Sequence, residues 1–257
     1  MYIDRNHVTE EFRKYTSAYD LTDRKVLLKV EHTYRVAEFC HRIAGSLSLS
    51  VEETDFAWLS GMLHDIGRFE QLRRYHTFMD KNSVNHAELS ADLLFREELI
   101  SRFAKLDAEE TDLMDKVIRN HNVYALPEEL TERERMFCDI LRDADKIDIL
   151  RVNCETPRTE IYDLPPEAFT DSQITEAVYE DIMSGRNVDR RNSSTGIDYI
   201  LGHIGFVYGL VFPESFRMVE EQGYLDELLS FRSRQPETAR KMGLIRRKVE
   251  GYVQGNL

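Results

Sequence analysis

The chain has 257 residues, a formal net charge of −13 and a hydrophobic content of 42%. These values are typical of a globular protein with a substantial core, and no apolar run reaches the ~18 residues that a membrane helix needs. The acidic balance disfavours nonspecific binding to nucleic acid or to an anionic membrane, but it is compatible with a small anionic substrate, because bound metal ions and local cations can reverse the sign within a cleft.

Helix signals dominate the first part of the chain. Thr9 is a candidate N-cap for a short helix with an aromatic side, and Thr22 or Asp23 begins a long amphipathic helix that extends to about Leu47. Residues 50–53 read Ser-Val-Glu-Glu, a capping box that predicts a helix over residues 56–66.

The same signals continue to the end of the chain. A helix is expected over residues 84–95, and capping boxes at residues 107–110 and 131–134 each precede a further apolar-periodic helix. Three prolines between residues 156 and 170 mark a candidate boundary. Further helices are expected at about residues 172–184 and 195–211, with two more from Pro213 onward.

No stretch alternates β-branched residues between hairpin turns, so strands are not expected and the predicted fold class is all-α. The predicted organisation is a helical core over residues 1–155 with a helical extension, residues 156–257, packed on it.

The cysteines and the N-terminal residues suggest a compartment. Cys40, Cys138 and Cys154 lack the short spacing of a metal motif, and the first two fall on apolar helix stripes, as reduced core cysteines do. The N-terminal residues lack the apolar region of a signal peptide. We therefore expect a reduced, cytoplasmic protein.

Metal-ligand residue types occur in a fixed order along the predicted helices. The candidates are His32, His64, Asp65, His86, His121 and Asp145. A buried carboxylate beside an imidazole is costly unless a cation or hydrogen bonds compensate it, and this donor set suits Fe, Mn, Zn and similar divalent ions. Because six ligands exceed what one ion usually needs, we predict two divalent ions, Fe or Mn first, with Zn or Mg as alternatives.

His32 lies on the apolar face of its predicted helix, where a lone histidine is more often a core residue than a ligand. His41, nine residues further along, falls on the opposite face and is expected to be solvent-exposed. His86 could instead be a surface histidine at a helix start, and His121 a cationic cap at a helix end.

The last acid of the set is ambiguous on composition alone, because Asp143 and Asp145 are two residues apart. The apolar stripe of their helix places Asp145 beside the buried face and Asp143 toward the outside. Helix geometry therefore favours Asp145.

The ordered set resembles the HD-domain superfamily of metal-dependent phosphohydrolases over roughly residues 20–150. The matching stretches are residues 32–37, 64–68, 85–88, 119–121 and 143–146. The resemblance implies a helical metal-binding core. Members with the first His, the His-Asp pair and the last Asp tend to hold one ion, and members with two further His tend to hold two. His86 and His121 match those further positions, and Asp65 then corresponds to the carboxylate that bridges both ions.

The resemblance also implies the activity. We expect hydrolysis of a phosphomonoester or phosphodiester, on a nucleotide or another small phosphorylated substrate, by a metal-activated water that depends on Asp65. Arg68 and Lys146 directly follow the metal motifs and could hold phosphate oxygens or form structural ion pairs instead. A homo-oligomer is compatible with the sequence.

Subfamily signatures do not identify the substrate. Arg68 stands where the deoxynucleotide 5′-phosphatases carry a catalytic Glu, and no Gly-Tyr-Pro of the cyclic-di-GMP phosphodiesterases follows His121. The alternatives are a di-iron oxygenase of the HD type, whose ligands would be the same, and an HD signalling module without catalysis.

Overall fold

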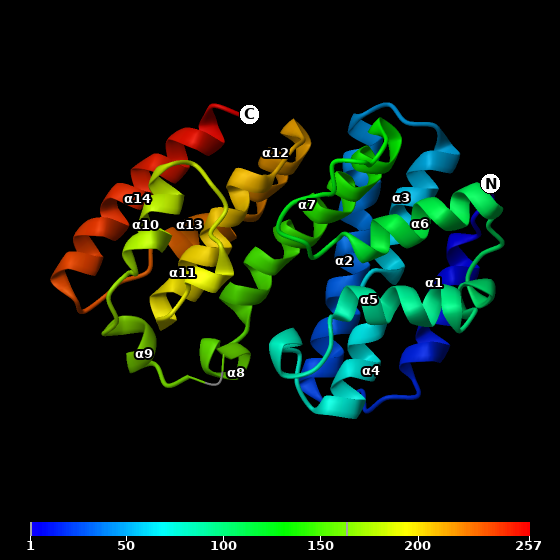
Figure 1. The fold of residues 1–257 in the computed structure, drawn as a ribbon, viewed down its shortest axis with the longest axis horizontal. Helices are drawn as coiled ribbons and strands as arrows, with labels where there is room; N and C mark the ends of the chain where they lie inside the picture. The colour runs from blue at the N-terminus through cyan, green and yellow to red at the C-terminus, as the bar shows by residue number, and fades with distance from the viewer. Residues whose placement is uncertain (1, 163) are drawn as a thin grey trace. The chain divides into compact units, whose positions relative to one another are not determined.

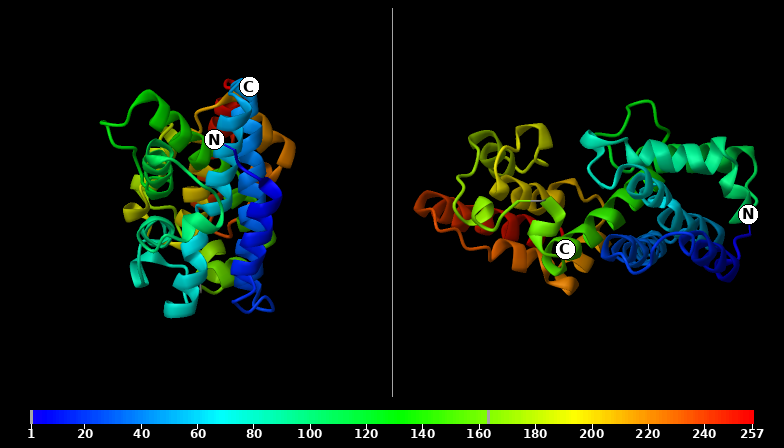
Figure 2. Two further views of the ribbon diagram at one scale, coloured as in Figure 1. Left: turned by 90° about the vertical axis from the view of Figure 1, so that its right-hand side faces the viewer. Right: turned by 90° about the horizontal axis from the view of Figure 1, so that it is seen from below.

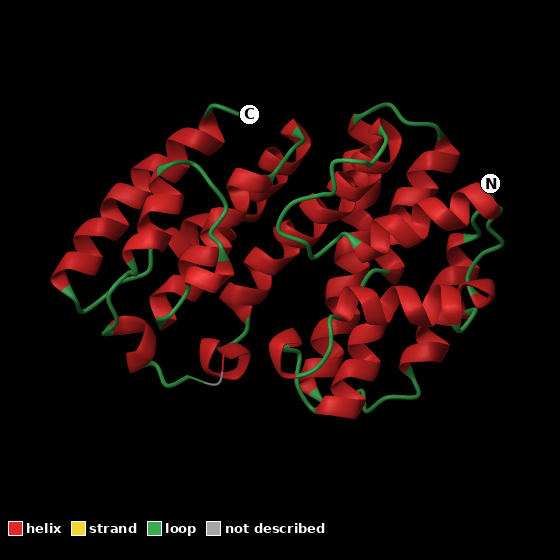
Figure 3. Ribbon diagram, viewed as in Figure 1, coloured by secondary structure: helices red, strands yellow, loops and turns green. Residues whose placement is uncertain are grey.

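The computed structural model describes residues 2–162 and 164–257, and its regular elements there are all helical (Figure 3). The described chain divides into two compact units, Met1–Asp145 and Lys146–Leu257. The division falls within one long helix, ahead of the boundary expected after residue 155. The all-α prediction is confirmed.

Seven α-helices begin among the described residues of the first unit, and Figure 1 labels them. They are α1 (Arg5–Thr16), α2 (Arg24–Ser46), α3 (Val51–Leu63), α4 (Ile66–Tyr75), α5 (His86–Ala91), α6 (Ala108–Arg119) and α7 (Glu132–Glu155), which continues into the second unit. Helix α2 packs along α3, α1 lies against α3, and α5 contacts both α4 and α6, as Figures 1 and 2 show.

Side-chain caps begin most of these helices where the sequence places them. Asp23 caps α2, and capping boxes at Ser50 and Asp107 begin α3 and α6. Thr131 exchanges hydrogen bonds with Glu134 in the same pattern before α7. These starts confirm the capping predictions, because each cap satisfies backbone N–H groups that the first turn leaves without partners.

Three predicted boundaries were wrong. Helix α1 begins earlier than Thr9, because the Asp4 side chain accepts hydrogen bonds from two backbone N–H groups of its first turn. The helix predicted over residues 56–66 breaks at Asp65, which has φ −105° and ψ 16°, and α4 begins at the next residue. The helix predicted over residues 84–95 is α-helical only to Ala91 and continues as a π-helical turn, Asp92–Arg96.

Two glycines allow the helices that carry the candidate ligands to approach closely. A Cβ on Gly61 of α3 would lie 2.6 Å from the Cα of Ala37 on α2, and a Cβ on Gly67 of α4 would lie 2.6 Å from the backbone nitrogen of Ser90 on α5. The Gly67 N–H also donates to the Ser90 hydroxyl at 2.9 Å. Neither contact leaves room for a side chain, so both glycines set the spacing of these helix pairs.

The second unit continues from α7 with seven further α-helices in the part of the chain that the structure describes. They are α8 (Arg158–Tyr162), α9 (Glu167–Thr170), α10 (Glu176–Met183), α11 (Gly196–Ile204), α12 (Pro213–Gln222), α13 (Tyr224–Leu229) and α14 (Pro236–Gln254). Three of these helices begin at Pro213 or later, where two were expected. The buried Asp198 carboxylate accepts hydrogen bonds from Thr175, Ser194 and Thr195, which ties the start of α11 to α10.

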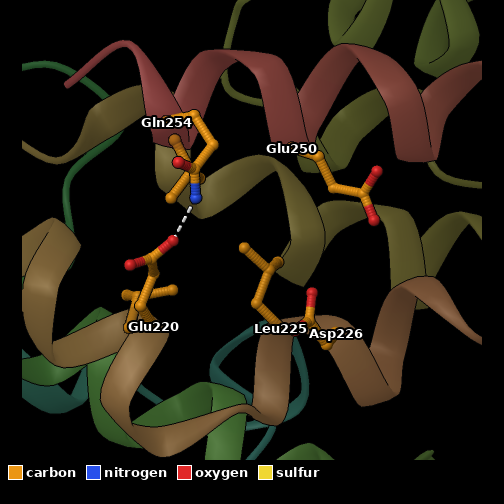
Figure 4. Close-up of a pocket in the computed structure, with 7 residues that line it drawn as sticks. Glu220, Leu225, Asp226, Glu250 and Gln254 are labelled. Carbon is orange, nitrogen blue, oxygen red and sulfur yellow. Dashed lines mark hydrogen bonds between the residues drawn. The ribbon is translucent and has the colours of Figure 1, made fainter. Parts of the chain in front are cut away.

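A cavity of about 490 Å³ lies in the second unit between α12, α13 and α14 (Figure 4). Its lining includes Glu220, Asp226 and Glu250 beside apolar side chains. Gln254 donates to Glu220, and Arg246 pairs with Glu250 at 2.6 Å. None of the six candidate metal ligands lines this cavity. All six lie in the first unit.

Candidate metal centre

The six candidate ligands converge within the first unit, although they come from five separate parts of the chain. His32 lies in α2, His64 and Asp65 form the break between α3 and α4, His86 begins α5, and His121 follows the end of α6. Asp145 lies in α7. Five of the six are buried and Asp145 is half-buried, with 15% of its side chain exposed.

The first cluster consists of His32, His64 and Asp145. The Nε2 atom of His32 lies 3.1 Å from Oδ1 of Asp145 and 3.3 Å from Nε2 of His64, and His64 Nε2 lies 3.8 Å from the same carboxylate oxygen. The three ligand atoms lie within 4.8 Å of one another, a spacing compatible with one metal ion.

The second cluster is formed by His86 and His121, whose Nε2 atoms are 3.0 Å apart. Both face Oδ1 of Asp65, at 3.6 Å and 3.7 Å. Two imidazoles and one carboxylate oxygen thus point to one place, as they would around a second ion.

Asp65 joins the two clusters. Its Oδ2 atom lies 3.6 Å from His32 Nε2 and 3.5 Å from His64 Nε2, while its Oδ1 atom faces the second cluster. Oδ1 is buried and has no hydrogen-bond partner among the described residues. A buried carboxylate oxygen without a hydrogen-bond donor is costly unless a cation compensates it. Arg68 Nε lies 3.6 Å from Oδ1, and an ion held with His86 and His121 would compensate it further, so the arrangement fits a carboxylate shared by two ions.

Hydrogen bonds at the opposite ring nitrogens orient three of the histidines. Nδ1 of His64 and Nδ1 of His121 each donate to a backbone carbonyl three residues earlier, at 2.7 Å in both cases. Nδ1 of His86 donates to Oδ2 of Asp80 at 2.6 Å. These bonds keep the proton on Nδ1 and leave the Nε2 lone pair directed into the centre, as a metal ligand requires.

The electrostatics of the site also suit metal binding. Burial lowers the pKa of His64 to about 4 and, together with the charge of Arg68, lowers the pKa of His86 to about 3. Burial alone would raise the pKa of Asp65, but the positive charges of Lys29 and Arg68 help to outweigh it and hold that pKa well below its usual value. At neutral pH these imidazoles are therefore neutral and the carboxylate is ionised, which are the ligand forms that bind metal.

Two cations lie against the shared carboxylate. Lys29 Nζ is 2.7 Å from Asp65 Oδ2, and Arg68 Nε is 3.6 Å from Asp65 Oδ1. Arg68 also pairs with Asp80 at 3.0 Å. Arg68 therefore lies beside the candidate metal centre, where it could contact phosphate. It also forms the structural ion pairs that the sequence left open as its other role.

The other residues that the sequence singled out lie elsewhere. Lys146 donates to the carbonyl oxygen of Gly209 in the second unit. His41 is exposed, as expected, and its ring contacts Arg5 at 2.9 Å. The outward placement of Asp143 was wrong, because its side chain is fully buried between the buried Arg142 and Ala144 on a stretch of α7 that is covered on several sides.

Sequence reasoning missed Lys29 and Asp80. Lys29 precedes His32 by three residues, so helical spacing alone would have placed the two on one face of α2. Asp80 lies in a short 3₁₀ helix, Asp80–Asn82, within the connection between α4 and α5. No periodic pattern there links it to His86.

Comparison with known proteins agrees with this geometry. No curated protein and no solved structure matches the chain. No helix of the described residues combines the length and apolar character needed to cross a membrane.

Residues 30–152 match the family model of the HD domain, a family that consists mostly of metal-dependent hydrolases and binds divalent ions. Residues 30–152 of the chain are therefore an HD domain, and this segment contains all six candidate ligands.

Proposed function

We propose that the protein is a phosphohydrolase that uses two divalent metal ions to cleave a small phosphate ester, such as a nucleotide. The observation that carries the proposal is the position of Asp65, whose two carboxylate oxygens each face a separate pair of imidazole nitrogens. His32, His64 and Asp145 would hold one ion, and His86 and His121 the other, with Asp65 shared. Iron and manganese accept this mixture of imidazole and carboxylate ligands.

Bound in this way, the ions would lower the pKa of a coordinated water and polarise a phosphoryl oxygen. The chain itself supplies the positioning. The Asp65 carboxylate keeps both clusters at one place, and the Nδ1 hydrogen bonds hold His64, His86 and His121 in the required orientation. Arg68 can bind phosphate oxygens through a guanidinium edge that lies beside Asp65. A phosphate contact for Lys146 stays a prediction.

The test is turnover by the metal-loaded protein on a panel of nucleotides and simple phosphate esters. Wild-type protein with Mn²⁺ or Fe²⁺ should hydrolyse at least one of them, and chelation should abolish the reaction. Asp65→Ala should lose turnover, because both clusters lose their common ligand and the charge that offsets the repulsion between the ions.

A matched control is His41→Ala, which removes an exposed histidine from α2 and should leave turnover unchanged. Circular dichroism would verify that both variants fold. Full turnover in folded Asp65→Ala would contradict the mechanism. Dioxygen consumption by the iron-loaded protein, without hydrolysis of any ester, would favour oxygenase chemistry instead.

A further inference from the structure

Lys29 occupies a position at the centre that the proposed chemistry has not used. It lies on α2 one turn before His32, and its ammonium group is 2.7 Å from Asp65 Oδ2, the oxygen that faces the first cluster. Its side chain is 16% exposed, so the ammonium group lies at the edge of the buried site.

The hydrogen-bond donors of Lys29 are only partly used. An ammonium group has three N–H donors, and the Asp65 carboxylate accepts from one of them. Among the described residues no other acceptor is seen for Lys29, which leaves two donors for an oxygen-rich ligand at the same place. The ion pair with Asp65 limits the movement of the long side chain, which reduces the conformational entropy that a ligand contact would cost.

Arg68 lies beside the other oxygen of Asp65, and its hydrogen-bond donors are also only partly used among the described residues. Its Nη1 atom already donates to Gln71, to the carbonyl of Phe78 and to Asp80. Its Nε atom is buried and has no hydrogen-bond partner among the described residues. Its Nη2 atom lies 3.3 Å from Nε2 of His86, the atom that would hold the second ion. An ion bound there would take the place of this contact, and the Nε and Nη2 edge could then bind two oxygens of a phosphate at once.

Phe78 contacts both cations. Lys29 Nζ and Arg68 Cζ each lie 5.7 Å from the centre of the Phe78 ring. Contact with one aromatic ring stabilises both cations and holds them as neighbours. Each half of the candidate metal centre thus has its own side-chain cation, and the two cations form one positively charged group beside Asp65.

We propose that Lys29 is a second phosphate-binding residue that acts together with Arg68, and that the pair selects a dianionic phosphomonoester over a monoanionic phosphodiester. This inference rests on the proposed function. A monoester has three terminal oxygens and two negative charges, enough to contact metal ions and both side-chain cations. A diester has two such oxygens and one charge, so it gains less from the second cation.

The probes for this proposal are inorganic phosphate and dimethyl phosphate, titrated into the Mn²⁺-loaded protein by calorimetry at neutral pH. Wild-type protein should bind phosphate more tightly than dimethyl phosphate. Lys29→Met should weaken phosphate binding by roughly 10- to 100-fold, the loss typical of one charge-assisted hydrogen bond, and should change dimethyl phosphate binding much less. Lys29→Arg should retain most of the phosphate affinity.

Lys25→Met is the matched control, because Lys25 is exposed on the same helix one turn earlier, and it should bind both probes like wild type. Metal content is measured for every variant. Unchanged phosphate affinity in fully loaded Lys29→Met would overturn the proposal, and so would a loss of metal, which would make Lys29 a structural partner of Asp65. Phosphate binding that depends on Lys29, in a protein that hydrolyses no ester, would support this site and contradict the proposed hydrolysis alone.

Discussion

At the scale of single residues, the orientation of His86 depends on one carboxylate. Asp80 accepts the Nδ1 proton of His86 at 2.6 Å, and Arg68 holds Asp80 in place from the other side. Nearby positive charge and the hydrogen bond from His86 outweigh the effect of burial and keep the pKa of Asp80 below its usual value, so it stays ionised. This is the carboxylate–histidine arrangement that orients and strengthens metal ligands.

We therefore expect Asp80→Asn to weaken metal binding at the second cluster about 10- to 100-fold, with little effect on the first. Titration of Mn²⁺ into metal-free protein would resolve the two affinities. The neighbouring Lys81→Ala, an exposed position in the same 3₁₀ helix, is the control. Two unchanged affinities in Asp80→Asn would show that His86 needs no carboxylate to orient it.

The convergence of the candidate ligands could be predicted from the sequence because their types and order carry chemical meaning without coordinates. Helical periodicity favoured Asp145 over Asp143, and Asp145 lies beside His32 and His64. It was not sufficient to place Asp143, because α7 is covered on several sides and the apolar stripe marks only one of them. Asp80 could not be predicted, because its contact with His86 depends on the path of an irregular connection.

At the scale of helices, the capping residues predicted most starts correctly, because caps are local interactions between neighbouring residues. The break at Asp65 could not be predicted in this way. Adjacent residues in a continuous helix project ~100° apart, and the backbone change at Asp65 lets both His64 and Asp65 face the centre. The helix breaks at Asp65 because of how α3 and α4 pack in the folded protein. Local helix propensity contains no information about that packing.

Gly67 tests how far the centre depends on the spacing of helices. In Gly67→Ala the new methyl group would meet the backbone of Ser90, so α4 and α5 must separate. We expect a loss of stability of about 1–3 kcal/mol, as for other overpacked sites, and weaker metal binding at the cluster that contains His86. Chemical denaturation and Mn²⁺ titration measure the two effects.

Gly45→Ala is the control for that variant. A Cβ at Gly45 of α2 meets nothing within 4 Å, so alanine there should stabilise the helix by about 0.5–1 kcal/mol. If Gly67→Ala behaved like Gly45→Ala in both measurements, the close approach of α4 and α5 would have no role in building the centre.

At the scale of the whole molecule, the candidate ligands all lie in the first of the two compact units, and α7 continues from this unit into the second. The sequence placed the boundary after residue 155 because prolines cluster there. The structure divides earlier, within α7, because a helix can run through a division between units without any local signal. The proposed chemistry accordingly assigns its metal ligands to the first unit alone.

The central claim is that Asp65 is shared by two ions, and the number and coupling of bound Mn²⁺ ions test it most directly. We expect two Mn²⁺ per chain at saturation. Their electron paramagnetic resonance spectrum should show magnetic coupling, with hyperfine lines at half the spacing of an isolated ion, because a carboxylate bridge holds the ions within a few Å of each other. A single ion per chain, or two ions with the spectrum of isolated Mn²⁺, would contradict the account.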